Sequence, residues 1–189
     1  MDFVRSNSGL YITSDTHFGH KNAIEYCNRP FSSIEEMDET IIRNWNNVVR
    51  PGDTVIHLGD FALGPKGLID EYLAALNGRI LLMKGNHDRG NSFWRQFEGK
   101  VSMLPWGYKM LAGAHGYSGI IFSHRQMELN KVPEHYLNFH GHIHSTPQNP
   151  KFNTLPHIDC GVDYWDFRPV PIKLILDTMV GVQNGRLGN

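Results

Sequence analysis

Apolar and polar positions alternate with two different periods along the first half of the chain. Short apolar runs typical of buried strands occupy residues 9–14, 53–58 and 79–84. Between them, apolar residues recur three or four positions apart at 34–49 and 68–76, which is the spacing of one face of an α-helix. Strands that alternate with helices in this way favour parallel pairing. The first half of the chain therefore predicts a layered α/β core.

The second half contains short strands that are separated by glycine-rich turns. Four strands are predicted there, at residues 108–111, 119–123, 137–140 and 170–176. We find no internal repeat and no linker in the sequence, so we expect a single domain over residues 1–189. The polar, glycine-rich stretch at 181–189 is expected to be a flexible tail.

Composition adds constraints on chemistry and partners. The chain has eleven histidines and two cysteines, Cys27 and Cys160, which favours free thiols in a reducing cytoplasm. It also favours imidazole and carboxylate ligation of a metal over a thiolate zinc site. The net charge of −1 gives no broad basic field, which argues against a long nucleic acid as the partner. No apolar run reaches the roughly 18 residues of a membrane span, so no membrane partner is expected.

Side chains of one chemical kind follow the predicted strands. In an open α/β sheet, ligands bind at the carboxyl ends of the strands. The side chains found there are oxygen or imidazole donors, and they are Asp15, His17, Asp60, Asn86, His124, His142 and His144. Seven donors are too many for one ion but suit two divalent ions that share Asp60 as a bridge. His87 lies beside this set and could protonate a leaving group, with Asp88 to orient it.

The order of these motifs resembles the calcineurin-like metallophosphoesterase family. The motifs are Asp-x-His, Gly-Asp, Gly-Asn-His-Asp, an isolated His and Gly-His-x-His, and they extend over most of the chain. Residues 14–20, together with Arg29-Pro30-Phe31 and Trp45, are similar to a small bacterial and phage branch of that family. The resemblance implies a four-layer α/β/β/α sandwich of two mixed sheets flanked by helices, with a dinuclear metal site between the sheets.

The resemblance also implies a role for each residue of the motifs. The first metal would be held by Asp15, His17, Asp60 and His144. The second metal would be held by Asp60, Asn86, His124 and His142. His87 would be the catalytic acid, and Asp88 would orient it.

The sequence departs from the family pattern after the first histidine. Many members have glycine at that position, whereas Phe18 stands here, followed by Gly19 and His20. We expect His20 and Asn22 to contact the substrate phosphate at the mouth of the site; a purely local role of His20 in the turn is the alternative. Arg125 is a further phosphate-binding candidate because it directly follows a ligand and has a long reach. The remaining histidines are expected to pack in the core or lie at the surface, and they are His57, His115, His135, His140 and His157.

These features predict a phosphodiesterase that depends on two metal ions. Metal-bound hydroxide would attack phosphorus while His87 protonates the leaving group. The predicted centre retains one positive charge, the sum of two divalent ions, two carboxylates and a hydroxide, and a diester monoanion neutralises it. The balanced charge of the chain favours a small diester, such as a nucleotide derivative, over a long polymer. Nitrogen and oxygen donors favour Mn²⁺, with Fe, Zn²⁺ and Ni²⁺ as further possibilities.

The same site is compatible with three further functions. One is a phosphomonoesterase or a nucleotide pyrophosphatase. Another is a nuclease, for which aromatic residues would provide a stacking platform, and the candidates are Trp94, Trp106 and Trp165. A third is a non-catalytic scaffold, which would be expected to lack part of the ligand set.

Overall fold

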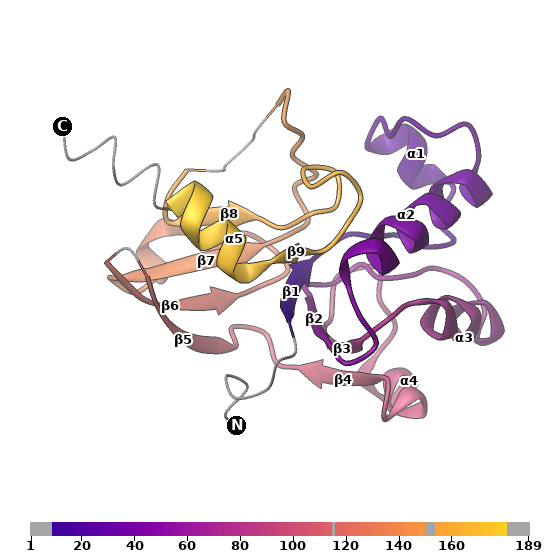
Figure 1. The fold of residues 1–189 in the computed structure, drawn as a ribbon, viewed down its shortest axis with the longest axis horizontal. Coiled ribbons are helices and arrows are strands. Elements are labelled where there is room, and N and C mark those ends of the chain that lie inside the picture. Colours follow the sequence, from indigo (N-terminus) through magenta and orange to yellow (C-terminus); the bar gives the residue numbers. More distant parts are fainter. Residues whose placement is uncertain (1–8, 115, 150–153, 181–189) are drawn as a thin grey trace.

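The computed structural model describes residues 9–114, 116–149 and 154–180, and it contains two β-sheets with helices beside them (Figure 1). The predicted α/β fold, with two mixed sheets flanked by helices, is confirmed. His115 and the stretch at 181–189 lie outside the described residues. None of the described helices is long and apolar enough to cross a membrane.

The first sheet is built mainly from the first half of the chain. Its strands, in spatial order, are β4 (Val101–Leu104), β3 (Arg79–Met83), β2 (Thr54–His57), β1 (Leu10–Thr13) and β9 (Val170–Pro171). The first four are parallel and β9 is antiparallel to β1. The three predicted strands of the first half and their parallel pairing are therefore confirmed. Their carboxyl ends share one edge of the sheet.

The second sheet comes from the second half of the chain. Its strands, in spatial order, are β5 (Lys109–Ala114), β6 (Tyr117–Phe122), β7 (Tyr136–His140) and β8 (His157–Asp159). The β5 strand is antiparallel to β6, whereas β6, β7 and β8 are parallel. The carboxyl ends of β6 and β7 therefore also lie at a common edge.

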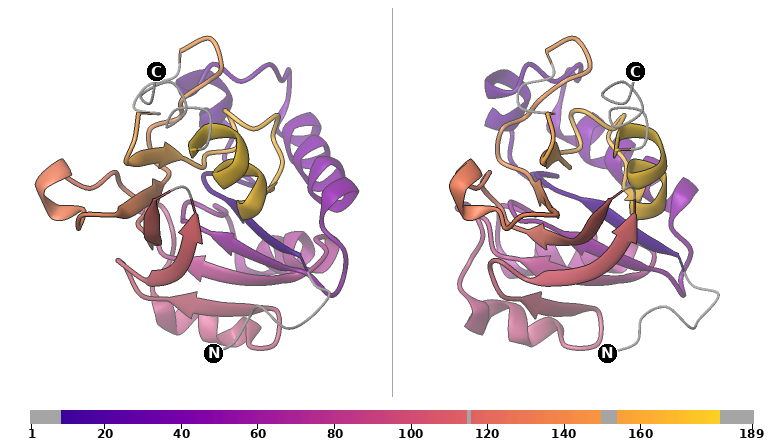
Figure 2. Two further views of the ribbon diagram at one scale, coloured as in Figure 1. Left: turned by 60° about the vertical axis from the view of Figure 1, so that its left-hand side comes forward. Right: turned by 90° about the vertical axis from the view of Figure 1, so that its left-hand side faces the viewer.

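Helices cover the outer face of the first sheet (Figures 1 and 2). They are α1 (Asn22–Tyr26), α2 (Ile34–Val48), α3 (Lys66–Ala75) and the short α4 (Asn91–Trp94). Trp45 of α2 and Ile69 of α3 are fully buried against sheet residues such as Val55 and Ile80. Burial of side chains of this size contributes roughly 1.5–3 kcal/mol each, so packing on the sheet holds these helices in place.

A second apolar core lies between the two sheets. Ile12 and Ile56 from the first sheet pack in one cluster with Phe122, Phe139 and Ile158 from the second. Successive side chains of a strand point to opposite faces, so each sheet presents one apolar face to the other. The two sheets therefore form the central layers of the sandwich.

The predicted strand at 170–176 is wrong in most of its length. Only Val170–Pro171 is a strand; the chain continues as α5 (Ile172–Ile175) and a π-helical turn (Leu176–Val180). Ile172, Ile175 and Leu176 are three and four positions apart, and all three pack into the core between the sheets. A short continuous apolar run fits a buried strand and a buried helix equally well, which explains the error.

The two sheets meet at the carboxyl ends of their strands. Ser14, directly after β1, forms an isolated parallel bridge with Gly161 beyond β8. The amide of Gly141, after β7, donates to the carbonyl of His124, after β6, at 2.9 Å. The amide of Asp15 also donates to the carbonyl of Gly59, after β2, at 2.9 Å, so the loops that follow β1, β2, β6 and β7 lie in one region.

Candidate metal centre

Two groups of possible metal ligands lie at this junction. Asp15, His17 and His144 form one group, and Asp60, His124 and His142 form the other. Within each group the candidate ligand atoms are within 4.8 Å of one another. Each group joins residues from both sheets, so the fold itself brings together side chains that are far apart in the sequence.

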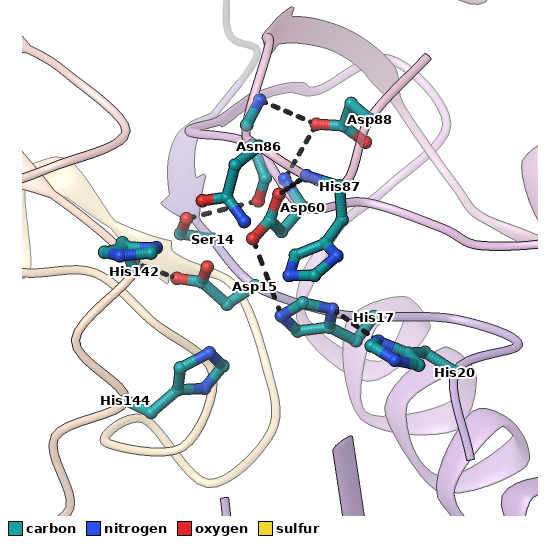
Figure 3. Close-up of polar contacts among 12 residues, drawn as sticks. Ser14, Asp15, His17, His20, Asp60, Asn86, His87, Asp88, His142 and His144 are labelled. Carbon is teal, nitrogen blue, oxygen red and sulfur yellow. Dashed lines mark hydrogen bonds and ion pairs between the residues drawn. The ribbon is translucent and has the colours of Figure 1, made fainter. Parts of the chain in front are cut away.

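Asp60 lies between the two groups (Figure 3). Its Oδ2 is 3.8 Å from Nε2 of His17, in the first group, and 3.4 Å from Nε2 of His124, in the second. Its Oδ1 accepts a hydrogen bond from the backbone amide of His87 at 2.8 Å, which fixes the carboxylate plane. Burial raises the pKa of Asp60, but the hydrogen bonds with His124 and the amide of His87 and the charges of His124 and His17 together outweigh it and lower this pKa, so the carboxylate is charged. This is the placement expected of a bridging carboxylate.

Asn86 belongs to the second group by distance. Its Oδ1 is 2.9 Å from Nε2 of His124. The other ring nitrogen of His124, Nδ1, is 2.9 Å from the carbonyl of Leu58. This contact leaves Nε2 as the nitrogen that faces Asp60 and Asn86, as is usual for a histidine that binds a metal.

Asp15 carries a buried oxygen without a protein partner. Its Oδ2 accepts from the backbone amide of His142 at 2.8 Å, whereas Oδ1 is buried and has no hydrogen-bond partner among the described residues. Burial raises the pKa of the Asp15 carboxyl to about 6. A buried acceptor without a donor is costly, and a cation would satisfy it. The donor set therefore fits a metal at the first group.

His144 is oriented by residues that belong to no ligand motif in the sequence. Its Nδ1 is 2.7 Å from Oδ2 of Asp163, and Asp163 in turn accepts from Nε of Arg29 at 2.8 Å. Arg29 also donates to the carbonyl of Asp15 at 2.6 Å. Burial opposes protonation of His144, but the contacts with Asp163 and Cys27 and the negative charges of Asp15 and Asp163 together outweigh it and raise the pKa of His144 to about 11. The carboxylate thus holds a proton on Nδ1 and orients the ring, and Nε2 could bind a metal once the ion displaces its proton.

The backbone at the predicted ligands is strained. Left-handed φ values between 52° and 69° occur at Asp15, His17, Asp60, His142 and His144. Such conformations cost about 1–3 kcal/mol each for residues other than glycine, and they concentrate at functional sites. Five of the seven predicted ligands are thus held in conformations that the surrounding fold must stabilise.

Two motif glycines are required by close packing against these carboxylates. A Cβ on Gly85 would overlap the carboxylate and amide of Asp60, and a Cβ on Gly141 would overlap Ser14 and the carboxylate of Asp15. The glycines therefore allow the strand ends to approach the acidic side chains directly.

The sequence profile of the calcineurin-like phosphoesterase family matches residues 10–177. The chain belongs to this family. The family depends on metal ions at a dinuclear centre, so the chain is a metal-dependent phosphoester hydrolase.

The chain is also similar to proteins from other sources. The chain is 37% identical to an uncharacterised protein of Methanocaldococcus jannaschii, with 88% of this chain and 89% of that protein covered. It is 28% identical to the gene 66 protein of Mycobacterium phage L5, with 84% and 88% covered. The crystal structure of a protein of unknown function from Aquifex aeolicus, 26% identical, matches with a TM-score of 0.67 over 89% of this chain and 98% of that one.

In this phosphoesterase, His87 lies at the edge of the first group and is exposed. Its ring centroid is 5.4 Å from that of His17 and 5.4 Å from that of His20 (Figure 3). His87 is in neither ligand group, which leaves its imidazole available for proton transfer.

The carboxylate of Asp88 is held by backbone amides. Its carboxylate accepts from the backbone amides of Asp60, Gly85 and Phe61 at 2.7, 2.8 and 3.0 Å. These amides belong to the two turns that follow β2 and β3, and they occupy both carboxylate oxygens. Asp88 therefore ties these two turns together; its role in orienting His87 stays a prediction.

The predicted phosphate-binding residues occupy different positions. His20 lies within the site, with its Nδ1 3.2 Å from Nδ1 of His17 (Figure 3). Its turn is anchored by Asp38, which accepts from the amide of Gly19 at 3.2 Å. Asn22, at the start of α1, and Arg125, directly after His124, are both exposed. His20 is thus close enough to position His17 as well as to meet a substrate.

The histidines predicted to lie outside the site fit the structure where they are described. His57 is fully buried, 3.0 Å from Oγ1 of Thr16, as expected for a core residue. His140 and His157 are buried on the second sheet, and His135 is exposed.

Proposed function

We propose that this phosphoesterase hydrolyses phosphodiesters at a centre of two divalent metal ions. The observation that supports this most is the position of Asp60, whose Oδ2 faces both ligand groups. In this proposal the first ion is held by Asp15, His17, Asp60 and His144, and the second by Asp60, Asn86, His124 and His142. When bound, two such ions supply an activated water and neutralise the oxygens of the phosphoryl group.

The protein groups contribute ligand orientation and proton transfer. Burial lowers the pKa of His17 to about 2, so its imidazole is neutral, which is the form that binds a metal. The water oxygen joins phosphorus and its proton leaves to solvent, while the bond from phosphorus to the leaving oxygen breaks. His87 donates a proton to that leaving oxygen. Its exposed position outside both groups supports this role.

The charge of the site favours a diester over a monoester. Two divalent ions, the carboxylates of Asp15 and Asp60 and one hydroxide equivalent leave a single positive charge, which a diester monoanion cancels. Nitrogen and oxygen donors without thiolate in either group favour Mn²⁺ as the activating ion. A phosphomonoesterase on the same centre is the second candidate, because the ligand geometry is compatible with it.

A nuclease and a non-catalytic scaffold find less support. A nuclease would need aromatic rings available for stacking; of the three tryptophan candidates, Trp94 is buried in the core, Trp165 donates its indole N–H to the carbonyl of Asp159, and Trp106 is 64% exposed. A non-catalytic scaffold would be expected to have gaps in its ligand groups, whereas all seven predicted ligands are present at the junction of the sheets.

A substrate panel tests the proposal. The Mn²⁺-loaded protein is assayed with bis(4-nitrophenyl) phosphate, 4-nitrophenyl phosphate, cyclic nucleotides and single-stranded DNA. We expect a higher kcat/KM for the diester than for the monoester with the same leaving group. A monoester that is hydrolysed faster would overturn the diester preference, and no turnover of either would overturn the proposed function.

A further inference from the structure

A cavity of about 880 Å³ opens beside the metal centre, on the side of His144. Its walls come from the end of α1 and the turn after it (residues 26–30) and from the loops at 143–149 and 163–167. His144 and Asp163 line it, so this cavity, here named the His144 pocket, adjoins the first ligand group. Its volume lies in the range of roughly 300–1,000 Å³ found for small-molecule sites.

The walls of the His144 pocket combine aromatic rings with unused amides. Tyr26 is 76% exposed although it is a large aromatic residue, and Phe167 is half-buried. The side-chain amides of Asn28, Gln148 and Asn149 also line the pocket, and they form no hydrogen bond within the part of the chain that the structure describes. Each amide offers a donor and an acceptor. Such a surface suits a flat ligand with polar edges.

The charges of the His144 pocket argue against a second phosphate. Arg29 is the one lysine or arginine among its described lining residues, and its guanidinium is already bonded to Asp163 and to the carbonyls of Asp15 and Thr16. Asp166 adds an exposed carboxylate to the rim, where it pairs with Arg168 at 3.5 Å. An uncharged group is therefore favoured over a polyphosphate or a dinucleotide.

Backbone strain extends from the metal centre into this pocket. Among the described residues other than glycine, nine have positive φ, and five of them are predicted ligands. Three more line the His144 pocket: Asn28 at 50°, Asp166 at 52° and Phe167 at 53°. Strain of this kind persists where the surrounding structure fixes a functional conformation.

From these features we propose that the His144 pocket binds the nucleoside part of a nucleoside phosphodiester. The inference rests on the proposed function, since it places the phosphoryl group at the metal centre and the nucleoside in the adjoining cavity. The exposed ring of Tyr26 offers a face to the base, and stacking of this kind tolerates any base. Phe167, which already contacts Phe31 and lies under the guanidinium of Arg29, contributes an apolar wall. The free amides and Asp166 are available to the polar edge of the base and to the sugar hydroxyls.

Kinetics with two diesters that share one leaving group test the pocket. The substrates are thymidine 5′-(4-nitrophenyl) phosphate and methyl 4-nitrophenyl phosphate, so the retained group is the only difference. We expect the protein to prefer the nucleoside ester in kcat/KM. In Tyr26→Ala that preference should fall about tenfold, mainly through KM, because one stacking face is lost. Trp106→Ala, which removes a 64% exposed ring outside the pocket, should keep the full preference.

A binding measurement separates this inference from the proposed function. Thymidine has no phosphate, so its effect on the amide NMR signals of the ¹⁵N-labelled, Mn²⁺-free protein reports the pocket alone. We expect shifts at Tyr26, Asn28 and Gln148. If these signals do not move and both esters react equally well, the pocket inference is overturned while the phosphodiesterase stands. If thymidine shifts these signals but neither ester is hydrolysed by the Mn²⁺-loaded protein, the nucleoside site is supported and the proposed reaction is not.

Discussion

At the scale of single residues, several predicted metal ligands already use one of their two polar atoms in a hydrogen bond with the protein. Nδ1 of His124 contacts the carbonyl of Leu58, and Nδ1 of His144 contacts the carboxylate of Asp163. Asp15 uses Oδ2 for the amide of His142, and its Oδ1 has no hydrogen-bond partner within the described ranges. Because the outer contacts fix each ring and carboxylate, the remaining atoms are aimed at the junction between the sheets before any ligand arrives.

The proton-donor role of His87 predicts a dependence on the leaving group. We expect His87→Ala to retain its metal content and to lose roughly 10²–10⁴-fold in kcat on diesters with alkoxide leaving groups. The loss should be much smaller with 4-nitrophenolate, which leaves without a proton. Equal losses on both kinds of substrate, measured at saturating substrate, would argue against acid catalysis by His87.

The packing of Gly141 predicts a sensitivity to one added methyl group. In Gly141→Ala the new Cβ would overlap Ser14 and the carboxylate of Asp15, which must then move. We expect Mn²⁺ affinity, measured by calorimetry, to fall at least tenfold, in line with the effect of disturbing a ligand's support. Gly52→Ala is the matched control, since no atom lies within 4 Å of its added Cβ. Unchanged affinity in Gly141→Ala would contradict the role of Asp15 as a ligand.

At the scale of elements, the parallel strands position the ligands and the turns after them complete the site. The turns after β2 and β3 are coupled by Asp88, whose carboxylate accepts amides from both. This coupling holds the Gly-Asp and Gly-Asn-His-Asp segments at a constant separation. The carboxylate of Asp60 and the imidazole of His87 are thereby placed together.

This coupling predicts that Asp88 matters first for stability. Asp88→Ala leaves three backbone amides without their acceptor, at about 1–3 kcal/mol for each one that water cannot reach. We therefore expect a clear drop in the free energy of unfolding, measured with urea, together with a loss of activity. Asp70→Ala, which removes an exposed ion pair on α3, should change stability by less than about 1 kcal/mol. A fully stable Asp88→Ala with low activity would instead favour a direct role of Asp88 in orienting His87.

Elements were predictable where the local pattern was unambiguous. The strands before Asp15, Asp60 and Gly85 are short apolar runs that end at a polar turn, and they were found from the sequence. The run after Val170 satisfies both helix and strand spacing, so its helical part could not be distinguished. The strand β8, of three residues, mixes polar and apolar positions, and it is recognisable only beside β7.

The same distinction applies to the site. The seven predicted ligands could be listed from the sequence because each follows a strand in a short motif. The pairing of Asp163 with Arg29 and His144 could not be predicted from the sequence. Asp163 lies 134 positions from Arg29 and 19 positions from His144, and no local motif marks the contact. The acceptor role of Asp88 depends likewise on amides from a neighbouring strand end, which the sequence does not place beside it.

At the scale of the whole molecule, the metal centre lies where the two sheets meet. Asp15, Asp60 and Asn86 come from the first sheet, and His124 and His142 follow strands of the second. Ions at this junction would therefore cross-link the two halves of the sandwich. The bound ions would also reduce the electrostatic repulsion between the acidic side chains that are buried there.

This arrangement predicts that metal binding stabilises the whole fold. Saturating Mn²⁺, at about 100 times its Kd, should add about 2.7 kcal/mol, which for a chain of 189 residues raises Tm by roughly 5–10 °C over the EDTA-treated protein. Differential scanning calorimetry measures the shift. In Asp60→Asn the shift should be much reduced because the proposed bridge is weakened. Equal Tm values with Mn²⁺ and with EDTA would show that the junction does not bind the ion tightly.

The most direct test of the dinuclear centre is anomalous diffraction from crystals of the Mn²⁺-loaded protein. We predict two manganese peaks roughly 3.5–4 Å apart, with Asp60 between them. One peak should lie beside Asp15, His17 and His144, and the other beside Asn86, His124 and His142. A single peak, or peaks away from these side chains, would contradict the account.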